Sequence, residues 1–385
     1  MTSPMIYLDY NSSTPVDPKV LEAMLPFFKE NFGNPSSQGH SWGWTADHAV
    51  QKARQQIATL LNCEPREIIF TSGATESNNW VLFGIYHQFA KLNEKVHVIS
   101  SPIEHNSVLN TLKYLEVLGV EVDFITPNSQ GIISVEAVRE KIKPYTKLIS
   151  LMWVNNEIGS INPIQELSQL ARERKIYFHS DGTQAVGKIS VDLQQTPVDL
   201  LSFSGHKIYG PKGVGVLFKR KKNPLVQLDP FLVGGGQENG DRSGTLNVPG
   251  IVGIGEACKL FQGRLTEEVT HYEKLSSLLY QQLKALFPEL KLNGPELGKQ
   301  RSPMNLSLTF PSVAGTDIAS RLPGLGVSSG SACSTGKIAS SHVLKGIGVT
   351  HEEAARTLRL SVGRFTKIED IEAAVSHFKS LLNSK

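Results

Sequence analysis

Residues 200–219 read LLSFSGHKIYGPKGVGVLFK, two short apolar runs joined by a glycine-rich turn. The runs Leu200–Phe203 and Val214–Phe218 have the length and composition of buried strands. Lys207 follows the end of the first run, which is unusual because a lysine ammonium group normally lies in water. The stretch therefore predicts a buried strand with a lysine at its carboxyl end.

Similar apolar runs recur earlier in the chain, at residues 68–70, 96–99, 122–125, 148–154 and 176–178. A helix start is expected at Asp17-Pro18, and segments of helical period separate most of the runs, at 45–61, 75–91, 105–118 and 163–174. Alternation of strands and helices over this length predicts an α/β fold, with a largely parallel sheet covered by helices on both faces.

The pattern changes near residue 250. Helical period is expected at 251–262, 264–287, about 340–346 and 367–382, with one strand at 304–310. A chain of 385 residues also exceeds one ordinary hydrophobic core. We therefore predict a large domain of residues 15–255 and a small domain of residues 1–14 and 256–385.

The composition is that of a soluble globular protein, with 40% hydrophobic and 19% charged residues. A net charge of +3 argues against nucleic acid or an anionic membrane as the partner. We see no secretory signal and no apolar stretch near the roughly 20 residues that span a bilayer. Cys63, Cys258 and Cys333 are too few and too scattered for a disulfide framework or a metal cage. We expect a reducing compartment, the cytoplasm, and no resident metal.

Small polar residues follow the run at 68–70, in the stretch TSGATES of residues 71–77. Where such residues pass from a strand into a helix, free backbone N–H groups at the helix start can hold a phosphate. An ordinary turn in which Thr75 caps the helix explains these residues equally well.

Polar residues follow other strands too: His105, Asn156, Asp181 and Gln184. Alone, His105 is more typical of a helix cap or a surface position, and Asp181 is either a helix N-cap or a buried partner for a cation. Since the carboxyl ends of parallel strands meet at one edge of a sheet, we expect these side chains near Lys207. A lysine, an acid for a ring nitrogen and a phosphate cradle are the parts that pyridoxal phosphate requires.

The string SFSGHKIYGPKGVG, residues 202–215, resembles the cofactor-lysine segment of the class V aminotransferase superfamily. Together with six further blocks the chain resembles the cysteine desulfurases of the NifS/IscS group. Those blocks are LDYNSSTP (8–15), FTSGATESNN (70–79), VNNEIG (154–159), RSGTLN (242–247), SSGSAC (328–333) and LRLSVGRFT (358–366). Any one of them is weak, but seven in family order from about residue 6 to 368 are specific.

The resemblance implies fold type I of the pyridoxal phosphate enzymes: a large domain with a mainly parallel mixed sheet, and a smaller α+β domain. It implies that Lys207 forms the internal aldimine with the cofactor. Asp181 is expected to pair with the pyridinium nitrogen and Gln184 with the phenolic oxygen. His105 is expected to stack on the ring and to transfer protons.

The resemblance also implies which residues hold the phosphate of the cofactor and the carboxylate of the substrate. The residues expected to hold the phosphate are Ala74, Thr75, Ser204 and His206. Asn156 is expected to contact the cofactor and, together with Arg359, to hold the substrate carboxylate. Thr245 of a partner subunit is expected to complete the phosphate site, which implies a homodimer.

Cys333 lies in the small, polar stretch GVSSGSACSTG, residues 326–336, which predicts an exposed thiol. Cys63 and Cys258 lie beside apolar helical segments and are expected to be inert. The resemblance implies that the Cys333 thiolate attacks the sulfur of L-cysteine, leaving a persulfide on Cys333 and releasing alanine. The sulfur would then pass to an iron–sulfur scaffold or another acceptor, including tRNA thiolation, and Cys333 could transiently ligate a cluster.

Three functions are weighed. The first is a cysteine desulfurase. The second is a related C–S lyase, selenocysteine lyase or aminotransferase of the same fold, and a lyase without a protein persulfide has no need of Cys333. The third is a non-catalytic scaffold, and the argument against it is the joint presence of Lys207, Asp181, His105, Cys333 and Arg359.

Overall fold

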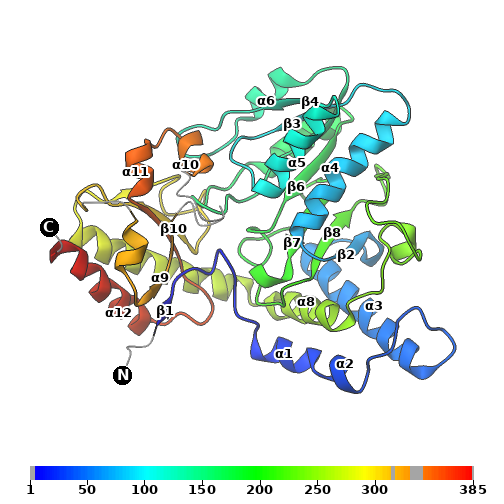
Figure 1. Cartoon of the computed structure of the whole chain (residues 1–385), viewed down its shortest axis with the longest axis horizontal. Helices are drawn as coiled ribbons and strands as arrows, with labels where there is room; N and C mark the ends of the chain where they lie inside the picture. Colours follow the sequence, from blue (N-terminus) through cyan, green and yellow to red (C-terminus); the bar gives the residue numbers. More distant parts are fainter. Residues whose placement is uncertain (1–4, 314–316, 330–340, 384–385) are drawn as a thin grey trace.

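The computed structural model describes residues 5–313, 317–329 and 341–383. Its centre is a seven-stranded sheet, and every apolar run predicted before residue 220 contributes a strand (Figure 1). In chain order these are β2 (Ile68–Thr71), β3 (His97–Ser100), β4 (Glu121–Phe124), β5 (Thr146–Ser150), β6 (Tyr177–Asp181), β7 (Leu200–Ser204) and β8 (Gly215–Lys219). Their order across the sheet is β2-β8-β7-β6-β5-β3-β4, and β8 runs antiparallel to both of its neighbours while the other pairs are parallel. The predicted α/β class with a mainly parallel sheet is confirmed.

Helices cover both faces of this sheet because successive strand residues point to opposite sides. On one face, Ile69 and Leu217 pack with apolar residues of α4 (Ala74–Ala90) and α5 (Asn106–Val117). On the other, Phe70 and Phe218 pack with residues of α3 (Ser41–Leu61), α7 (Ile164–Glu173) and α8 (Val248–Phe261). The strands are therefore apolar on both sides, as their continuous apolar runs indicate.

Two expected helix starts had different outcomes. Asp17 caps α1 (Pro18–Met24) by accepting a hydrogen bond from the Lys19 N–H at 2.9 Å, with proline at the first position as predicted. α4 begins at Ala74 with Gly73 at the N-cap position, so the alternative in which Thr75 caps this helix is wrong. Thr75 already lies inside the first turn.

The second part of the molecule is built on a small antiparallel sheet in the order β12-β13-β10-β9. Its strands are β9 (Lys291–Leu292), β10 (Asn305–Thr309), β12 (Ser328–Ser329) and β13 (Thr357–Ser361). β1 (Ile6–Tyr7) pairs in parallel with β11 (Leu325–Gly326), so the start of the chain lies against the small sheet (Figure 1). From there the chain runs to the large sheet through Asn11, whose N–H donates to Ser361 Oγ at 2.9 Å.

The remaining helices are α2 (Pro26–Lys29), α6 (Val135–Lys141), α9 (Leu265–Leu286), α10 (His342–Gly346), α11 (His351–Ala355) and α12 (Ile368–Lys379). Short 3-10 segments are η1 (Pro65–Glu67), η2 (Gly205–Lys207), η3 (Glu238–Gly240), η4 (Ile318–Arg321) and η5 (Ser380–Asn383). Within the described ranges no helix is both long and apolar enough to cross a membrane. The domain boundary at residue 255 stays a prediction, and α8 spans it.

Candidate active site

A pocket opens at the carboxyl ends of the large sheet, where it meets β13 of the small sheet. It gathers ten of the predicted site residues: Ala74, Thr75, His105, Asn156, Asp181, Gln184, Ser204, His206, Lys207 and Arg359. Thr245 is exposed and does not line this pocket, so its place in a partner's site stays a prediction. Cys333 lies outside the described residues. The pocket is thus built from segments far apart in the sequence, and the roles of its residues stay predictions.

Lys207 ends the 3-10 turn η2, which directly follows β7. Its Nζ donates to the Asn11 carbonyl at 2.8 Å and to the Ser12 carbonyl at 2.5 Å. These two acceptors come from the segment that crosses from the small sheet. The lysine at the carboxyl end of a buried strand is therefore a pocket group, held by backbone oxygens.

Asp181 is the last residue of β6 and is only 5% exposed. Its Oδ1 accepts from the Thr183 N–H at 3.0 Å, and its Oδ2 accepts from Asn78 Nδ2 at 2.8 Å. Turns rather than a helix follow it, so the helix N-cap alternative is wrong. A carboxylate oriented by amide donors can hold the protonated nitrogen of a pyridine ring.

His105 is both a helix cap and a residue of the pocket. It is the N-cap of α5, because its Nδ1 accepts from the Ser107 N–H at 3.1 Å, and it also lines the pocket. Burial lowers the pKa of His105; Asp181 opposes this effect and Lys207 adds to it. With Nδ1 used as an acceptor, the proton of the neutral ring is on Nε2.

A buried chain of hydrogen bonds joins His105 to Asp181. Ser107 Oγ lies 2.8 Å from His105 Nδ1 and 2.9 Å from Asn78 Nδ2, the same nitrogen that donates to Asp181. Sequence reasoning missed Ser107 and Asn78. Asn78 belongs to the quoted block FTSGATESNN, but its polar neighbours do not mark it as a buried amide that needs partners.

The predicted phosphate seat is a close approach of three segments. Ser204 Oγ accepts from the Ala74 N–H at 2.7 Å, at the first residue of α4. Gly73 and Gly215 permit this approach, since a Cβ on Gly215 would lie 2.5 Å from the Gly73 Cα. Burial, with help from neighbouring lysines, lowers the pKa of His206 to about 4, so its ring is neutral at pH 7. The seat offers N–H and O–H donors, which suit a phosphate dianion.

Arg359 enters the pocket from β13 and is 7% exposed. Its Nη2 pairs with Asp9 Oδ1 at 2.8 Å and its Nη1 donates to the Asn156 carbonyl at 3.1 Å. Its Nε has no hydrogen-bond partner among the described residues. A buried, unpartnered guanidinium N–H beside the pocket fits the predicted carboxylate site. Asp9 and Asn11 were missed as individual residues, although both belong to the quoted block LDYNSSTP.

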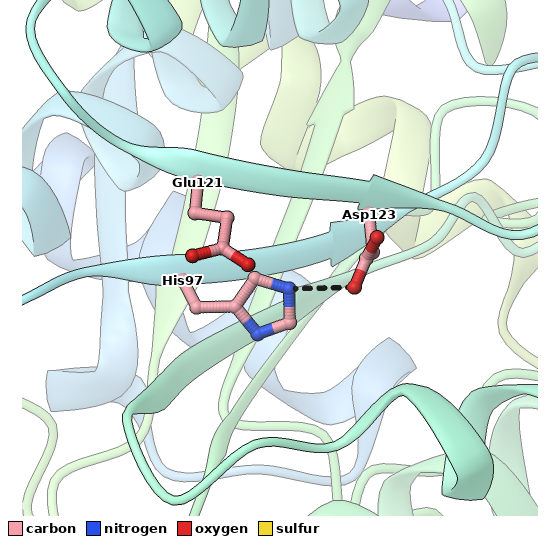
Figure 2. Close-up of side chains that lie close together, drawn as sticks. All are labelled: His97, Glu121 and Asp123. Atoms are coloured by element: carbon pink, nitrogen blue, oxygen red, sulfur yellow. Dashed lines mark ion pairs between the residues drawn. The ribbon is translucent and has the colours of Figure 1, made fainter.

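A second cluster of ionisable side chains lies toward the amino ends of the sheet. His97 Nε2 lies 3.3 Å from Asp123 Oδ2, and Glu121 lies beside the ring (Figure 2). These three residues have the donor types of a metal site. However, Lys143 Nζ lies 2.5 Å from Glu121 Oε1 and 2.6 Å from Asp123 Oδ2, and Lys95 pairs with the other oxygen of Glu121. Ammonium groups already neutralise the two carboxylates, so the cluster is an ion-pair network.

The two described cysteines are poor nucleophiles. Burial raises the pKa of Cys258, which is fully buried, and of Cys63, which is partly buried. Both thiols therefore stay protonated at neutral pH. This agrees with the prediction that they are inert.

Comparisons with known proteins support the predicted family. Residues 6–374 match the aminotransferase class-V family. The chain is 45% identical over 371 residues to cysteine desulfurase IscS of Rickettsia typhi, which covers 96% of this chain and 89% of that relative. A solved NifS-like protein superposes with a TM-score of 0.89 and 36% identity, covering 98% of this chain and 99% of that one. The structure of SspA in complex with cysteine matches with a TM-score of 0.82 and 37% identity, covering 94% and 100%. The chain belongs to the class-V aminotransferase family and, within it, to the group of IscS-like cysteine desulfurases.

Proposed function

We propose that this protein is a pyridoxal phosphate-dependent cysteine desulfurase, which converts L-cysteine to L-alanine and keeps the sulfur as a persulfide on Cys333. The observation that carries the proposal is the meeting of Lys207, Asp181 and Arg359 in one pocket. The kinship to IscS supports the reaction, and the complex of the related SspA with cysteine supports the substrate.

The residues present fit pyridoxal phosphate. Asp181 would face the ring nitrogen and Gln184 the phenolic oxygen, and His105 would lie on the ring. The donors at the start of α4, with Thr75, Ser204 and His206, would hold the phosphate. When bound to Lys207, the cofactor supplies an electron sink for the substrate's Cα.

The chain's own groups then divide the remaining tasks. We assign the substrate carboxylate to Arg359, whose Nε–H lacks a partner among the described residues, and to Asn156. Lys207 Nζ is the amine that takes and returns protons at the substrate carbon. His105 presents an Nε2–H because its Nδ1 is held by the Ser107 N–H, so it acts first as a proton donor.

Sulfur transfer is assigned to Cys333 on the sequence alone, since it lies outside the described residues. The thiolate forms an S–S bond to the substrate sulfur while the Cβ–S bond breaks. The electron pair stays with the substrate carbon, which is protonated to give alanine. No external oxidant is needed, because the substrate carbon is reduced as the two sulfurs become joined.

The persulfide sulfur would pass to an acceptor such as an iron–sulfur scaffold protein or the machinery of tRNA thiolation. We propose a cytoplasmic homodimer, in which Thr245 completes the phosphate site of the partner. The exposure of Thr245 outside its own pocket supports this arrangement, and sedimentation at twice the chain mass is the expected result.

The deciding experiment replaces Cys333 with alanine and compares it with Cys63→Ala. Cys333→Ala should still bind cofactor and L-cysteine, because those steps use other segments, yet it should form almost no alanine and no persulfide. Cys63→Ala should behave as wild type, since its thiol is protonated at neutral pH. Alanine assays and peptide mass spectrometry give the readouts. Undiminished alanine production by Cys333→Ala would instead favour the C–S lyase.

A further inference from the structure

Lys188 is a buried lysine that the proposed reaction does not use. It lies in the turns after β6, seven residues beyond Asp181, and is only 2% exposed. A lysine is seldom buried this completely unless its ammonium group has a partner. No carboxylate within the described ranges forms an ion pair with Lys188; its Nζ donates instead to Gln184 Oε1.

Gln184 is the pocket residue expected to face the phenolic oxygen of the cofactor. It is 4% exposed, and its Nε2 donates to the Asn11 carbonyl at 2.9 Å. A carboxamide has one oxygen acceptor and two N–H donors. Lys188 uses the oxygen and Asn11 uses one N–H, so one N–H is left for the pocket.

These two contacts together determine which way the carboxamide is turned. The Asn11 carbonyl can only accept, so it requires the nitrogen of Gln184 on its side. If the carboxamide were reversed, two oxygens would face each other at Asn11. The amine of Lys188 would then meet the amide nitrogen.

Resting on the function proposed above, we propose that Lys188 is a positioning residue, which holds the Gln184 carboxamide so that an N–H faces the phenolic oxygen of pyridoxal phosphate. Lys188 does not itself touch the cofactor in this assignment. Burial, and next the charges of Lys207 and Arg359, lower the pKa of Lys188 well below its usual value. The influence of these two pocket residues agrees with a position of Lys188 behind the pocket.

The test measures binding of two cofactors to apoprotein by equilibrium dialysis: pyridoxal phosphate, and its analogue without the phenolic hydroxyl. Lys188→Met removes the donor and leaves an unbranched side chain that is one atom shorter. The substitution should weaken the binding of pyridoxal phosphate by about three- to tenfold, as expected for the loss of one hydrogen bond. Binding of the 3-deoxy analogue should change little, because that analogue has no oxygen for Gln184.

Two further variants sharpen the measurement. In a Gln184→Ala background, Lys188→Met should cause no additional loss. Lys219→Met removes another buried lysine, 4% exposed and paired with Asp241, and should not alter the preference between the two cofactors. If Lys188→Met does not fold, Lys188→Gln, which keeps a donor on a shorter side chain, should show the same selective loss in smaller size.

The outcomes separate the two proposals. Equal weakening of both cofactors by the Lys188 variants, or no weakening of either, overturns the positioning role. Failure of the wild-type protein to bind pyridoxal phosphate overturns the proposed function instead. A loss confined to the cofactor with the phenolic oxygen, and absent without Gln184, supports Lys188 as the positioning residue.

Discussion

The two ends of the large sheet hold similar side chains in different arrangements. At the carboxyl ends, His105, Asp181 and Lys207 line one pocket. Toward the amino ends, His97 lies beside Glu121 and Asp123 (Figure 2). Lys143 pairs with both of these carboxylates. Both sets contain an imidazole, a carboxylate and an amine.

The two sets of side chains differ in the groups that neutralise their carboxylates. Lys143 contacts both carboxylates of its cluster directly, and these contacts lower the pKa of Asp123 and of Glu121, the latter to about 2. Asp181 is held by amide donors, and no lysine or arginine in the described part of the chain forms an ion pair with it. A direct ion pair leaves little charge to act on a ligand, whereas a carboxylate oriented by amides keeps its charge for one. The same residue types therefore give a structural network at one end and a binding pocket at the other.

The largest difference between the two ends of the sheet is expected when the lysine at each end is removed. Lys207→Ala should lower turnover by about 10³-fold or more, because it removes both the covalent attachment and a proton-transfer group. It should also abolish the cofactor linkage that borohydride traps. Lys143→Ala should retain both the turnover and the linkage that borohydride traps. A trapped linkage in the Lys207→Ala protein would disprove the assignment of this lysine.

The next effect compares the two aspartates. Asp181→Ala should lower turnover on the order of 10²-fold, as for loss of one oriented electrostatic contact in an active site. Asp123→Ala should leave turnover near wild type, since Lys143 still pairs with Glu121. Steady-state rates, with circular dichroism to confirm folding, provide the measurement. Equal effects of the two substitutions would contradict the distinction drawn between the two ends.

The smallest expected effect concerns stability against acid. Burial, and next the charge of Lys143, lower the pKa of His97 in the folded chain. The unfolded chain, with an ordinary histidine pKa near 6.5, then binds more protons, so stability falls as the pH drops below about 6.5. His97→Gln should therefore lose less unfolding free energy than wild type between pH 7 and pH 5.

Urea unfolding at both pH values tests this expectation. The slope of the unfolding free energy against urea concentration should be the same for the two proteins, so that their unfolding midpoints can be compared directly. An unchanged pH dependence in His97→Gln would show that other buried groups, such as His179, account for the acid sensitivity.

Sequence reasoning recovered the parts of the fold that local pattern controls. The seven strand runs were visible because a strand buried on both faces must be apolar along its length. β13, which carries Arg359, was not predicted as a strand although TLRLS alternates polar and apolar residues as strands do; the stretch was considered only as part of a motif block. β1, β9, β11 and β12 were missed for a simpler reason: two residues carry no period.

The candidate site shows a similar division. Ten of the predicted site residues lie in one pocket, most of them because the carboxyl ends of the strands meet at one edge of the sheet, whereas Thr245 does not line it. Asn78, Ser107 and Lys188 were not singled out, because each acts through a neighbour rather than on a ligand. Their partners lie on other segments or, for Lys188, four residues away in a turn, and single-residue patterns do not show such contacts.

Local patterns in the sequence were enough to predict a mainly parallel sheet covered by helices, a lysine at the end of a buried strand and a resemblance to cysteine desulfurases. Hydrophobic period and residue chemistry are local, so they can be read without coordinates. The partner of each charged side chain became visible in the folded chain: Arg359 pairs with Asp9, Asp181 with Asn78, and Lys188 with Gln184. A hydrogen bond depends on distance and direction in space, and the folded topology brings together residues as far apart in the chain as Arg359 and Asp9, which are separated by 350 positions.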